Sequence, residues 1–343
     1  MDKTIRTGVL SMFESLLIVA EAGSNHNGDL DTAVKMVRRA KESGADAIKF
    51  QNYTLSSLFS PGHYEGTLKL RDKKWRKRIE HLSVKQEWHR ALASTAQEAG
   101  IHYFSTPFSL EAVDSLDDFV PFYKIASGDI TFLPLLEKVG RKGKGVFLST
   151  GASSLDEIET AVRLLEHFDL PFICIMHCIM LYPPPDEGLH LNFIDTLKER
   201  FKHPIGFSDH TLDSDAATIA AGKGVSAIEK HFTLDCTQDG ADHRNSLDPE
   251  RFREMAERIR RCELMLGSPE RPIGEIETRE RVFARRGVYA KEDLKRGERV
   301  SPRLVSYLRP KLGIGAEEFG SLKNRRLNTD VSKGTPLEQG MFE

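Results

Sequence analysis

The 343-residue sequence predicts an α/β fold, a closed (β/α)8 barrel followed by a small, mostly β domain. Three observations support this prediction. Short runs of β-branched and aromatic residues alternate with segments of helical periodicity. Eight such runs fall within about 250 residues, which is the usual length of a single barrel of this kind. After about Gly267 the pattern changes to arginine-rich sequence that is punctuated by turns.

Strands and helices are expected to alternate through the first 267 residues. The expected strands cover residues 16–23, 47–51, 102–108, 122–127, 145–151, 172–178, 204–210 and 227–232. Amphipathic helical segments include residues 32–43, 85–99, 155–168, 213–222 and 249–266. Gly44, Gly100 and Gly267 stand where three of these helices are expected to end. Repeated strand–helix units therefore predict a TIM barrel over residues 1–267.

Two segments depart from this repeat. Residues 53–79 contain a basic stretch with an interleaved tryptophan, a composition that binds nucleic acid in some proteins. We interpret the segment as a lid or a solvated surface insertion, because the whole chain carries almost no net charge. Residues 268–282 are interpreted as a linker, and residues 283–343 as the small second domain.

The composition excludes several classes of protein. The chain has 49 Lys and Arg residues against 51 Asp and Glu residues, a formal net charge of −2, which argues against a nucleic-acid partner. No apolar run reaches the roughly 18 residues of a membrane span, and the apolar stretch at 9–20 is interrupted by Glu14. We therefore expect no membrane partner, no secretory signal and a cytoplasmic location. Four scattered cysteines predict neither a disulfide framework nor a zinc site.

Most of the expected strands end in small or polar residues, which is where a barrel enzyme carries its active site. Side chains alternate along a strand, so one face is shared by Lys49 and Gln51, by Phe104 and Thr106, by Ser208 and His210, and by Glu229 and His231. If the polar face points inward, these side chains meet at one mouth.

His210 and His231 end two neighbouring strands. Imidazole is a ligand for Zn²⁺, Mn²⁺ and iron, and two such ligands leave positions open for water and substrate. A histidine buried for structural reasons is the alternative, but two at equivalent ends of adjacent strands favour a metal site.

Lys49 and Lys124 are expected to face the same mouth. An unpaired buried ammonium is costly, so two inward lysines indicate an anionic ligand such as a phosphate or a carboxylate. Pairing with Glu21 and Glu229 is the alternative, which we expect for one lysine rather than for both. A lysine near the barrel centre can also act as a Schiff-base nucleophile.

Seven ordered motifs, together with the C-terminal segment, resemble the sialic acid synthase family. They are Ile18-Val-Ala-Glu-Ala-Gly-Ser-Asn-His-Asn-Gly, Ala47-Ile-Lys-Phe-Gln, Phe104-Ser-Thr-Pro-Phe, Tyr123-Lys-Ile-Ala-Ser-Gly, Leu148-Ser-Thr-Gly, Gly206-Phe-Ser-Asp-His-Thr and Ile228-Glu-Lys-His-Phe-Thr. Arg286-Gly-Val-Tyr-Ala through Leu308-Arg-Pro resembles that family's antifreeze-like (SAF) domain. The resemblance implies an enzyme that condenses phosphoenolpyruvate with an N-acylated hexosamine, giving a nonulosonic 2-keto acid and phosphate.

The resemblance also implies a role for each matching residue. His210 and His231 would bind a divalent cation, Mn²⁺ in the first place and Mg²⁺ or Co²⁺ as alternatives, which also holds the acceptor's aldehyde oxygen. Phosphoenolpyruvate would be held by Lys49, Lys124, Thr106, Ser127, Ser149 and Ser208, with Gln51 nearby. Glu21 and Asp242 would contact the acceptor or the reacting water, and Tyr182 would line the sugar pocket. Arg309 would reach into the partner's site in a domain-swapped homodimer.

The mechanism that the resemblance implies begins with attack of carbon 3 of phosphoenolpyruvate on the open-chain aldehyde. Water then captures the cation at carbon 2, and phosphate leaves by C–O cleavage. The expected catalytic residues are Glu21, Lys49, Lys124, His210 and His231.

Several residues on the acceptor side depart from the family's pattern. Ile179-Met-Leu precedes Tyr182-Pro where many members carry Thr-Asn or Thr-Ser, and Asp129 stands where many carry Glu. The identity of the acceptor, and whether it is 6-phosphorylated, therefore stay open. Two other functions are kept as alternatives, a Schiff-base pyruvate aldolase using Lys49 or Lys124 and a noncatalytic carbohydrate-binding barrel.

Overall fold

The computed structural model describes residues 13–60, 80–240 and 242–343. Most of the predicted basic lid or insertion, residues 61–79, lies outside these residues. The chain divides into two compact units, Met1–Gly267 and Ser268–Glu343.

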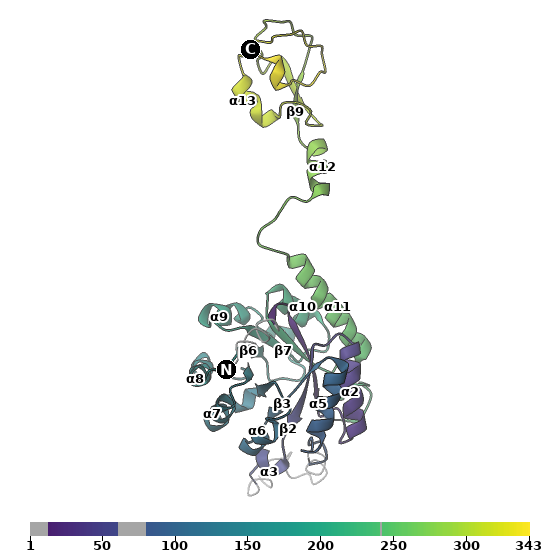
Figure 1. The fold of residues 1–343 in the computed structure, drawn as a ribbon, viewed down its shortest axis with the longest axis vertical. Coiled ribbons are helices and arrows are strands. Elements are labelled where there is room, and N and C mark those ends of the chain that lie inside the picture. The colour runs from purple at the N-terminus through teal and green to yellow at the C-terminus, as the bar shows by residue number, and fades with distance from the viewer. Residues whose placement is uncertain (1–12, 61–79, 241) are drawn as a thin grey trace. The chain divides into compact units, whose positions relative to one another are not determined.

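Eight parallel strands close the first unit into a barrel, in the order in which they occur in the sequence (Figure 1). They are β1 (Leu17–Gly23), β2 (Ala47–Asn52), β3 (His102–Pro107), β4 (Phe122–Ile125), β5 (Gly145–Ser149), β6 (Ile173–Cys178), β7 (Ile205–Asp209) and β8 (Ala227–His231). The predicted barrel is confirmed, and the differences are confined to strand ends. Strand β4 ends before its predicted limit because Ser127–Asp129 forms the 3-10 helix η3.

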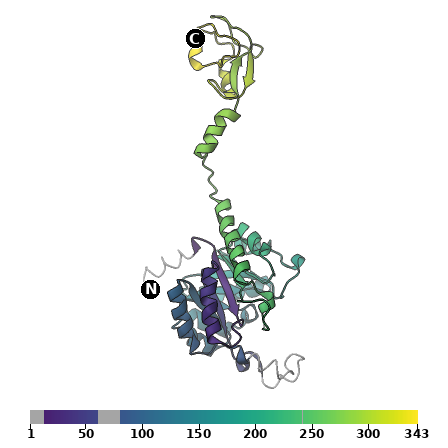
Figure 2. The same ribbon diagram turned by 90° about the vertical axis from the view of Figure 1, so that its right-hand side faces the viewer.

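Helices surround the strands and bury their apolar sides against them. They are α2 (Leu30–Glu42), α3 (Leu55–Leu58), α5 (Trp88–Ala99), α6 (Leu110–Leu116), α7 (Leu133–Arg141), α8 (Leu155–Glu166), α9 (Phe193–Arg200), α10 (Asp215–Gly222) and α11 (Pro249–Leu266). Helices α2 and α5 lie side by side on the outside of the barrel (Figure 2). Gly100 ends α5 in the left-handed conformation that glycine adopts most readily, and a Ser154–Glu157 capping box begins α8.

A cluster of phenylalanine rings fills the amino end of the barrel. Phe104 and Phe122 have ring centroids 4.7 Å apart, and Phe147 lies 5.3 Å from Phe122 and 5.2 Å from Phe172. Edge-on contacts of this kind pack large apolar rings closely, so this end of the barrel is filled by apolar side chains.

A buried polar network fixes α5 against β2 and β3. His89 Nδ1 lies 2.7 Å from the Tyr103 hydroxyl, and its Nε2 lies 3.0 Å from Asn52 Nδ2. Burial lowers the pKa of His89 from 6.5 to about 4, so the folded protein keeps this imidazole neutral under mildly acidic conditions.

We expect His89 to make the protein sensitive to acid. Between pH 6.5 and about 4 the unfolded chain binds a proton at this position that the folded chain does not, so the free energy of unfolding falls as the pH falls. The stability advantage of the wild type over His89→Gln should therefore shrink by up to about 2 kcal/mol between pH 7 and pH 5 in urea unfolding. The control Tyr103→Phe keeps the imidazole and should keep the wild-type slope. An advantage that stays constant with pH contradicts the prediction.

The second unit has its own small core. It contains α12 (Glu275–Ala284), β9 (Gly287–Ala290), β10 (Val305–Leu308) and α13 (Phe319–Leu322), with 3-10 helices η6 (Ala316–Glu318) and η7 (Gln339–Met341). Strands β9 and β10 pair antiparallel. The buried side chains are Val288, Ala290, Leu294, Val300, Val305, Ile314, Phe319, Leu322, Leu327, Val331, Leu337 and Phe342. Among the described residues of the chain, no helix is both long and apolar enough to cross a membrane.

Much of the segment predicted to be a linker is helical. Helix α12 runs through residues 275–284, whereas the predicted linker covers 268–282, and none of its residues is buried. The segment is rich in glutamate and arginine, which favour a helix without requiring a packed face. The charged residues of this segment therefore predict that it is exposed to solvent, but they do not predict that it lacks a helix.

Candidate active site

The polar side chains predicted to meet at the mouth of the barrel come together there. Strand pairing places Glu21 beside both Lys49 and His231, and places Ser208 beside Glu229. All five are buried, with at most 5% of each residue exposed. Alternation along parallel strands is sufficient to produce this cluster, because inward residues at equivalent depth meet around the barrel axis.

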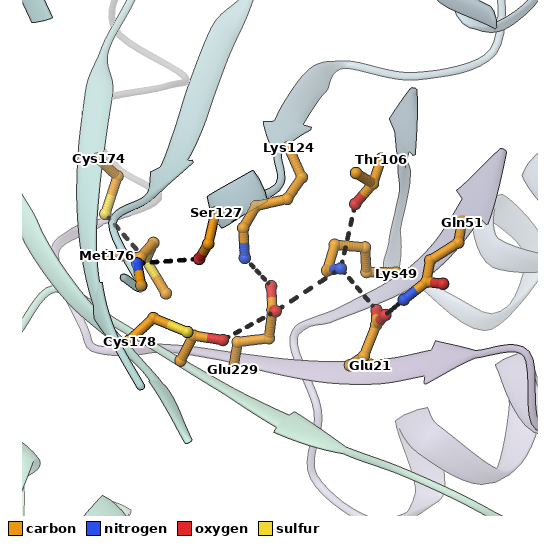
Figure 3. Close-up of polar contacts among 12 residues, drawn as sticks. Glu21, Lys49, Gln51, Thr106, Lys124, Ser127, Cys174, Met176, Cys178 and Glu229 are labelled. Atoms are coloured by element: carbon orange, nitrogen blue, oxygen red, sulfur yellow. Dashed lines mark hydrogen bonds and ion pairs between the residues drawn. The ribbon is translucent and has the colours of Figure 1, made fainter. Parts of the chain in front are cut away.

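Both lysines are paired with carboxylates. Lys49 Nζ lies 2.8 Å from Glu21 Oε2 and 3.6 Å from Glu229 Oε1, while Lys124 Nζ lies 2.7 Å from Glu229 Oε2. Figure 3 shows Glu229 between the two lysine side chains. The expectation that only one lysine would find a carboxylate is wrong, because Glu229 has two oxygens and serves both. The inference that the lysines lack a counter-charge fails with it.

The network holds Glu229 and Lys49 in their charged states. Burial alone would raise the pKa of Glu229, but Lys124 and Lys49 lower it to about 2. Burial likewise works against the ammonium of Lys49, yet Glu21 and Glu229 raise its pKa above the ordinary value. A Schiff-base nucleophile must be a neutral amine, so this environment disfavours that role for Lys49.

His210 and His231 lie beside the network, with ring centroids 5.3 Å apart. His210 Nδ1 lies 2.7 Å from the carbonyl oxygen of Ile179, and since a carbonyl only accepts, Nδ1 carries the proton and Nε2 keeps its lone pair. Burial and the neighbouring His231 lower the pKa of His210 to about 3, so it is neutral at physiological pH. Tyr182 stacks on His210 at 4.0 Å between centroids and meets His231 edge-on at 5.7 Å.

The hydroxyl groups differ in how well they are satisfied. Thr106 Oγ1 accepts a hydrogen bond from Lys49 at 3.2 Å, and Ser208 donates to Glu229 Oε1 at 3.2 Å. Ser127 Oγ accepts from the backbone N–H of Gly151 at 2.9 Å. Ser149 Oγ is buried without a hydrogen-bond partner, as is His231 Nδ1. Unsatisfied buried polar atoms are uncommon, and their presence here indicates that the site has capacity for a ligand.

The remaining predicted residues lie in different places. Gln51 Nε2 donates to Glu21 Oε1 at 2.7 Å. A Cβ atom added at Gly23 would lie 3.3 Å from Glu21 Oε1 and 3.7 Å from Asp242 Oδ2, so Asp242 borders the same network. Arg309 belongs to the second unit, where it follows β10 and is exposed to solvent.

Asp129 is a residue of this region that the sequence marks as a departure on the acceptor side but to which it assigns no role. Its Oδ2 is buried without a hydrogen-bond partner, and burial raises the pKa of this carboxyl from 3.8 to about 6. Asp129 belongs to η3, the same short helix as Ser127. The sequence marks it only as a difference from the family's glutamate, and nothing in the local pattern signals that its carboxyl is left unpaired.

Two residues could hold a divalent cation by the chemistry of their side chains. His210 offers a neutral Nε2, and His231 offers a ring nitrogen that no protein group occupies. Within the described part of the chain, no cluster of three or more His, Cys, Asp or Glu side chains is arranged to hold a metal. A cation here would therefore depend on two imidazoles, with other positions filled by water or substrate.

Comparison with family models gives two matches along the chain. The model described as the NeuB family matches residues 36–271, and the model described as the SAF domain matches residues 285–343.

Individual relatives cover nearly the whole chain. An uncharacterised protein of Methanocaldococcus jannaschii, MJ1065, is 43% identical over 318 residues, which cover 92% of this chain and 91% of that protein. The N,N'-diacetyllegionaminic acid synthase of Legionella pneumophila is 35% identical over 329 residues, covering 93% and 92%. Among solved structures, the N-acetylneuraminic acid synthetase of Leptospira borgpetersenii in complex with citrate is 32% identical, with a TM-score of 0.72, and the match covers 78% of this chain and 90% of that one.

Proposed function

The chain belongs to the NeuB family, and on that premise we propose that it condenses phosphoenolpyruvate with an N-acylated hexosamine, or a related aldose, to give a nonulosonic 2-keto acid and phosphate. The observation that supports this most strongly is the network around Glu229. Two buried lysines, two carboxylates and two imidazoles share one end of one barrel. Such a site combines groups that bind an anion with groups that bind a cation.

In this proposal the lysines hold phosphoenolpyruvate. Lys49 and Lys124 contact its acidic groups, and Ser127, Ser149 and Ser208 supply hydroxyl donors around them. The free hydroxyl of Ser149 needs no rearrangement to bind. As the C–O bond to phosphate breaks, ammonium groups that are already fixed in place stabilise the charge on the departing oxygen.

Glu21 is proposed to act as the general base that accepts a proton from the reacting water. Its two oxygens are oriented by Lys49 and Gln51, at 2.8 and 2.7 Å, so the carboxylate is held rigidly at the mouth. When water adds at carbon 2, Glu21 takes the proton, and Asp242 contacts the acceptor beside it. Tyr182, stacked on His210, forms a wall of the acceptor pocket.

A divalent cation, Mn²⁺ in the first place, is proposed to bind to His210 and His231. When bound, it supplies a Lewis acid for the carbonyl oxygen of the acceptor. The residues fit this role because His210 is held in the tautomer that leaves Nε2 free, and because His231 Nδ1 is buried without a protein partner.

A phosphate-release screen tests the proposal. Purified protein is given phosphoenolpyruvate, Mn²⁺ and a panel of free and 6-phosphorylated N-acyl hexosamines. We expect phosphate release that requires both an acceptor and the cation. A pyruvate adduct trapped by borohydride, without phosphate release, would support the Schiff-base aldolase instead. Sugar binding without turnover across the panel would support the noncatalytic barrel.

We further propose that the protein acts as a domain-swapped homodimer in which Arg309 completes the partner's site. The residue is exposed in its own unit. An arginine fits this task because its planar guanidinium binds carboxylate and phosphate groups with two parallel hydrogen bonds.

Subunit mixing tests this arrangement. Lys49→Ala damages the barrel site and Arg309→Ala damages the second unit, so each homodimer should be nearly inactive. Random mixing after partial unfolding should restore roughly a quarter of wild-type phosphate release, because half of the dimers are hybrids with one intact site. Mixing Lys49→Ala with Lys124→Ala is the control and should restore nothing. Equal activity in both mixtures contradicts the swapped arrangement.

A further inference from the structure

Lys230 is a buried charge that the proposed reaction does not use. It lies on β8 between Glu229 and His231, and because its neighbours face the barrel interior, its own side chain faces the surrounding helices. Its side chain is fully buried. An ammonium in such a position requires hydrogen-bond acceptors for all three of its protons.

Lys230 has those three acceptors, and they flank a single residue. Its Nζ donates to Asp209 Oδ2 at 2.8 Å, to the carbonyl oxygen of Thr211 at 2.6 Å and to Thr211 Oγ1 at 2.9 Å. Asp209 Oδ1 in turn accepts from the backbone N–H of Thr211 at 2.8 Å. The residue enclosed between Asp209 and Thr211 is His210.

One ammonium therefore connects the two strand ends that carry the histidines. Asp209 and Lys230 are paired in register between β7 and β8, and His210 and His231 are the next residues along each strand. The ring of His210 is held separately by the carbonyl oxygen of Ile179. The clamp formed by Asp209, Thr211 and Lys230 fixes the backbone from which that ring projects.

Stability alone does not account for this clamp. Desolvating two charges costs several kcal/mol per ion, and apolar residues of similar volume in place of a buried ion pair are often neutral or stabilising. A directional network does, however, restrict the backbone more than apolar packing does. A cation held by only two imidazoles needs their nitrogen atoms at a fixed separation.

We propose that Lys230 and Asp209 are positioning residues that hold His210 and His231 at the separation required for binding a divalent cation. The inference rests on the proposed cation site. None of the clamp's own hydrogen bonds goes to either ring, so it acts through the backbone on each side of His210. Its loss should weaken cation binding while leaving both imidazoles in place.

The test uses the full-length, metal-free protein and titrates Mn²⁺ by calorimetry. The variant Asp209→Asn/Lys230→Met removes both charges with little change in volume. Its dissociation constant for Mn²⁺ should rise about tenfold or more. Phosphate release should recover in part at saturating Mn²⁺, because both ligands remain.

A second, partly exposed ion pair supplies a control away from the histidines. Arg260 Nη2 lies 2.5 Å from Asp46 Oδ2, and Asp46 also accepts from the N–H of Ile18 near the start of β1. Asp46→Asn/Arg260→Met should lower the thermal midpoint while leaving Mn²⁺ affinity within about twofold of wild type. Mn²⁺ affinity within about threefold of wild type in the Asp209→Asn/Lys230→Met variant overturns the inference.

A milder variant covers the case in which the double variant does not fold. Thr211→Val removes the hydroxyl that accepts from Lys230 and makes a long 3.4 Å hydrogen bond to the carbonyl oxygen of Asp213, and it should raise the Mn²⁺ dissociation constant about threefold. Unchanged affinity there also overturns the inference. Failure of the proposed function gives a different result, because it appears in the wild type itself. If the wild type releases no phosphate, the proposed reaction is wrong. If it releases phosphate without binding Mn²⁺, both the cation site and the positioning role of Lys230 and Asp209 are wrong.

Discussion

Replacing Lys49 with alanine is expected to lower phosphate release from phosphoenolpyruvate by at least about a hundredfold. Lys49 is the residue that joins Glu21, Glu229 and Thr106. Without it, two buried carboxylates remain with only the ammonium of Lys124 between them, and the network repels an anionic substrate. The loss should appear in kcat/KM of the phosphate-release assay, with a thermal midpoint that still reports a folded barrel.

A surface lysine provides the control for this change. Lys138 pairs with Asp114 at 2.5 Å on the outside of the barrel, and Lys138→Ala should leave phosphate release within about twofold of wild type. Near-wild-type release by Lys49→Ala would remove the anion-binding role from the network. Release lost equally in both variants would instead indicate general damage to the fold.

Replacing His231 with alanine is expected to have an effect of similar size, again at least about a hundredfold on phosphate release. The substitution removes one of the two imidazoles proposed to hold the cation and the ring that Tyr182 meets edge-on. Because the cation would then depend on His210 alone, the variant should also fail to bind Mn²⁺ in calorimetry. The loss should persist at high Mn²⁺ concentration.

His177 offers a comparison on β6, which pairs with β7 on the side away from β8. It too is buried near the end of a strand, but its Nε2 lies 2.8 Å from the carbonyl oxygen of Leu189 and its ring stacks on Phe207. His177→Asn should retain Mn²⁺ binding even where it lowers stability. If His231→Ala binds Mn²⁺ as tightly as His177→Asn does, the cation site lies elsewhere.

The alternation of strand-like and helical segments along the sequence was sufficient to predict the barrel. Successive side chains of a strand point alternately into the barrel and toward the helices, and this alternation can be read without knowledge of distant contacts. Lys49, Glu229 and His231 could therefore be assigned to the inward face. The ends of the strands were less predictable. At Ile125 the strand stops because the next residues turn into η3, and a predicted element boundary is commonly wrong by two or more residues.

The ion pairs between particular side chains could not be predicted from the sequence. Alternation brings Lys49, Lys124 and Glu229 to the same mouth but does not determine that one carboxylate serves two lysines, because that depends on rotamers and on strand spacing. The same limit applies to Lys230, whose charged side chain faces a layer that periodicity assigns to apolar residues. Asp129 Oδ2 is buried without a hydrogen-bond partner. Whether a buried oxygen has a partner depends on residues distant in the sequence, so no local pattern predicts it.

The phenylalanine cluster at the amino end of the barrel has a consequence for the route that molecules take. Phe104, Phe122 and Phe147 fill that end with packed rings, which leaves the carboxyl ends of the strands as the entrance. Glu21 is paired in register with both Lys49 and His231, so the lysine and the histidine line this same entrance. Two substrates and two products would therefore have to share one doorway, and neither partner of the reaction has a private passage.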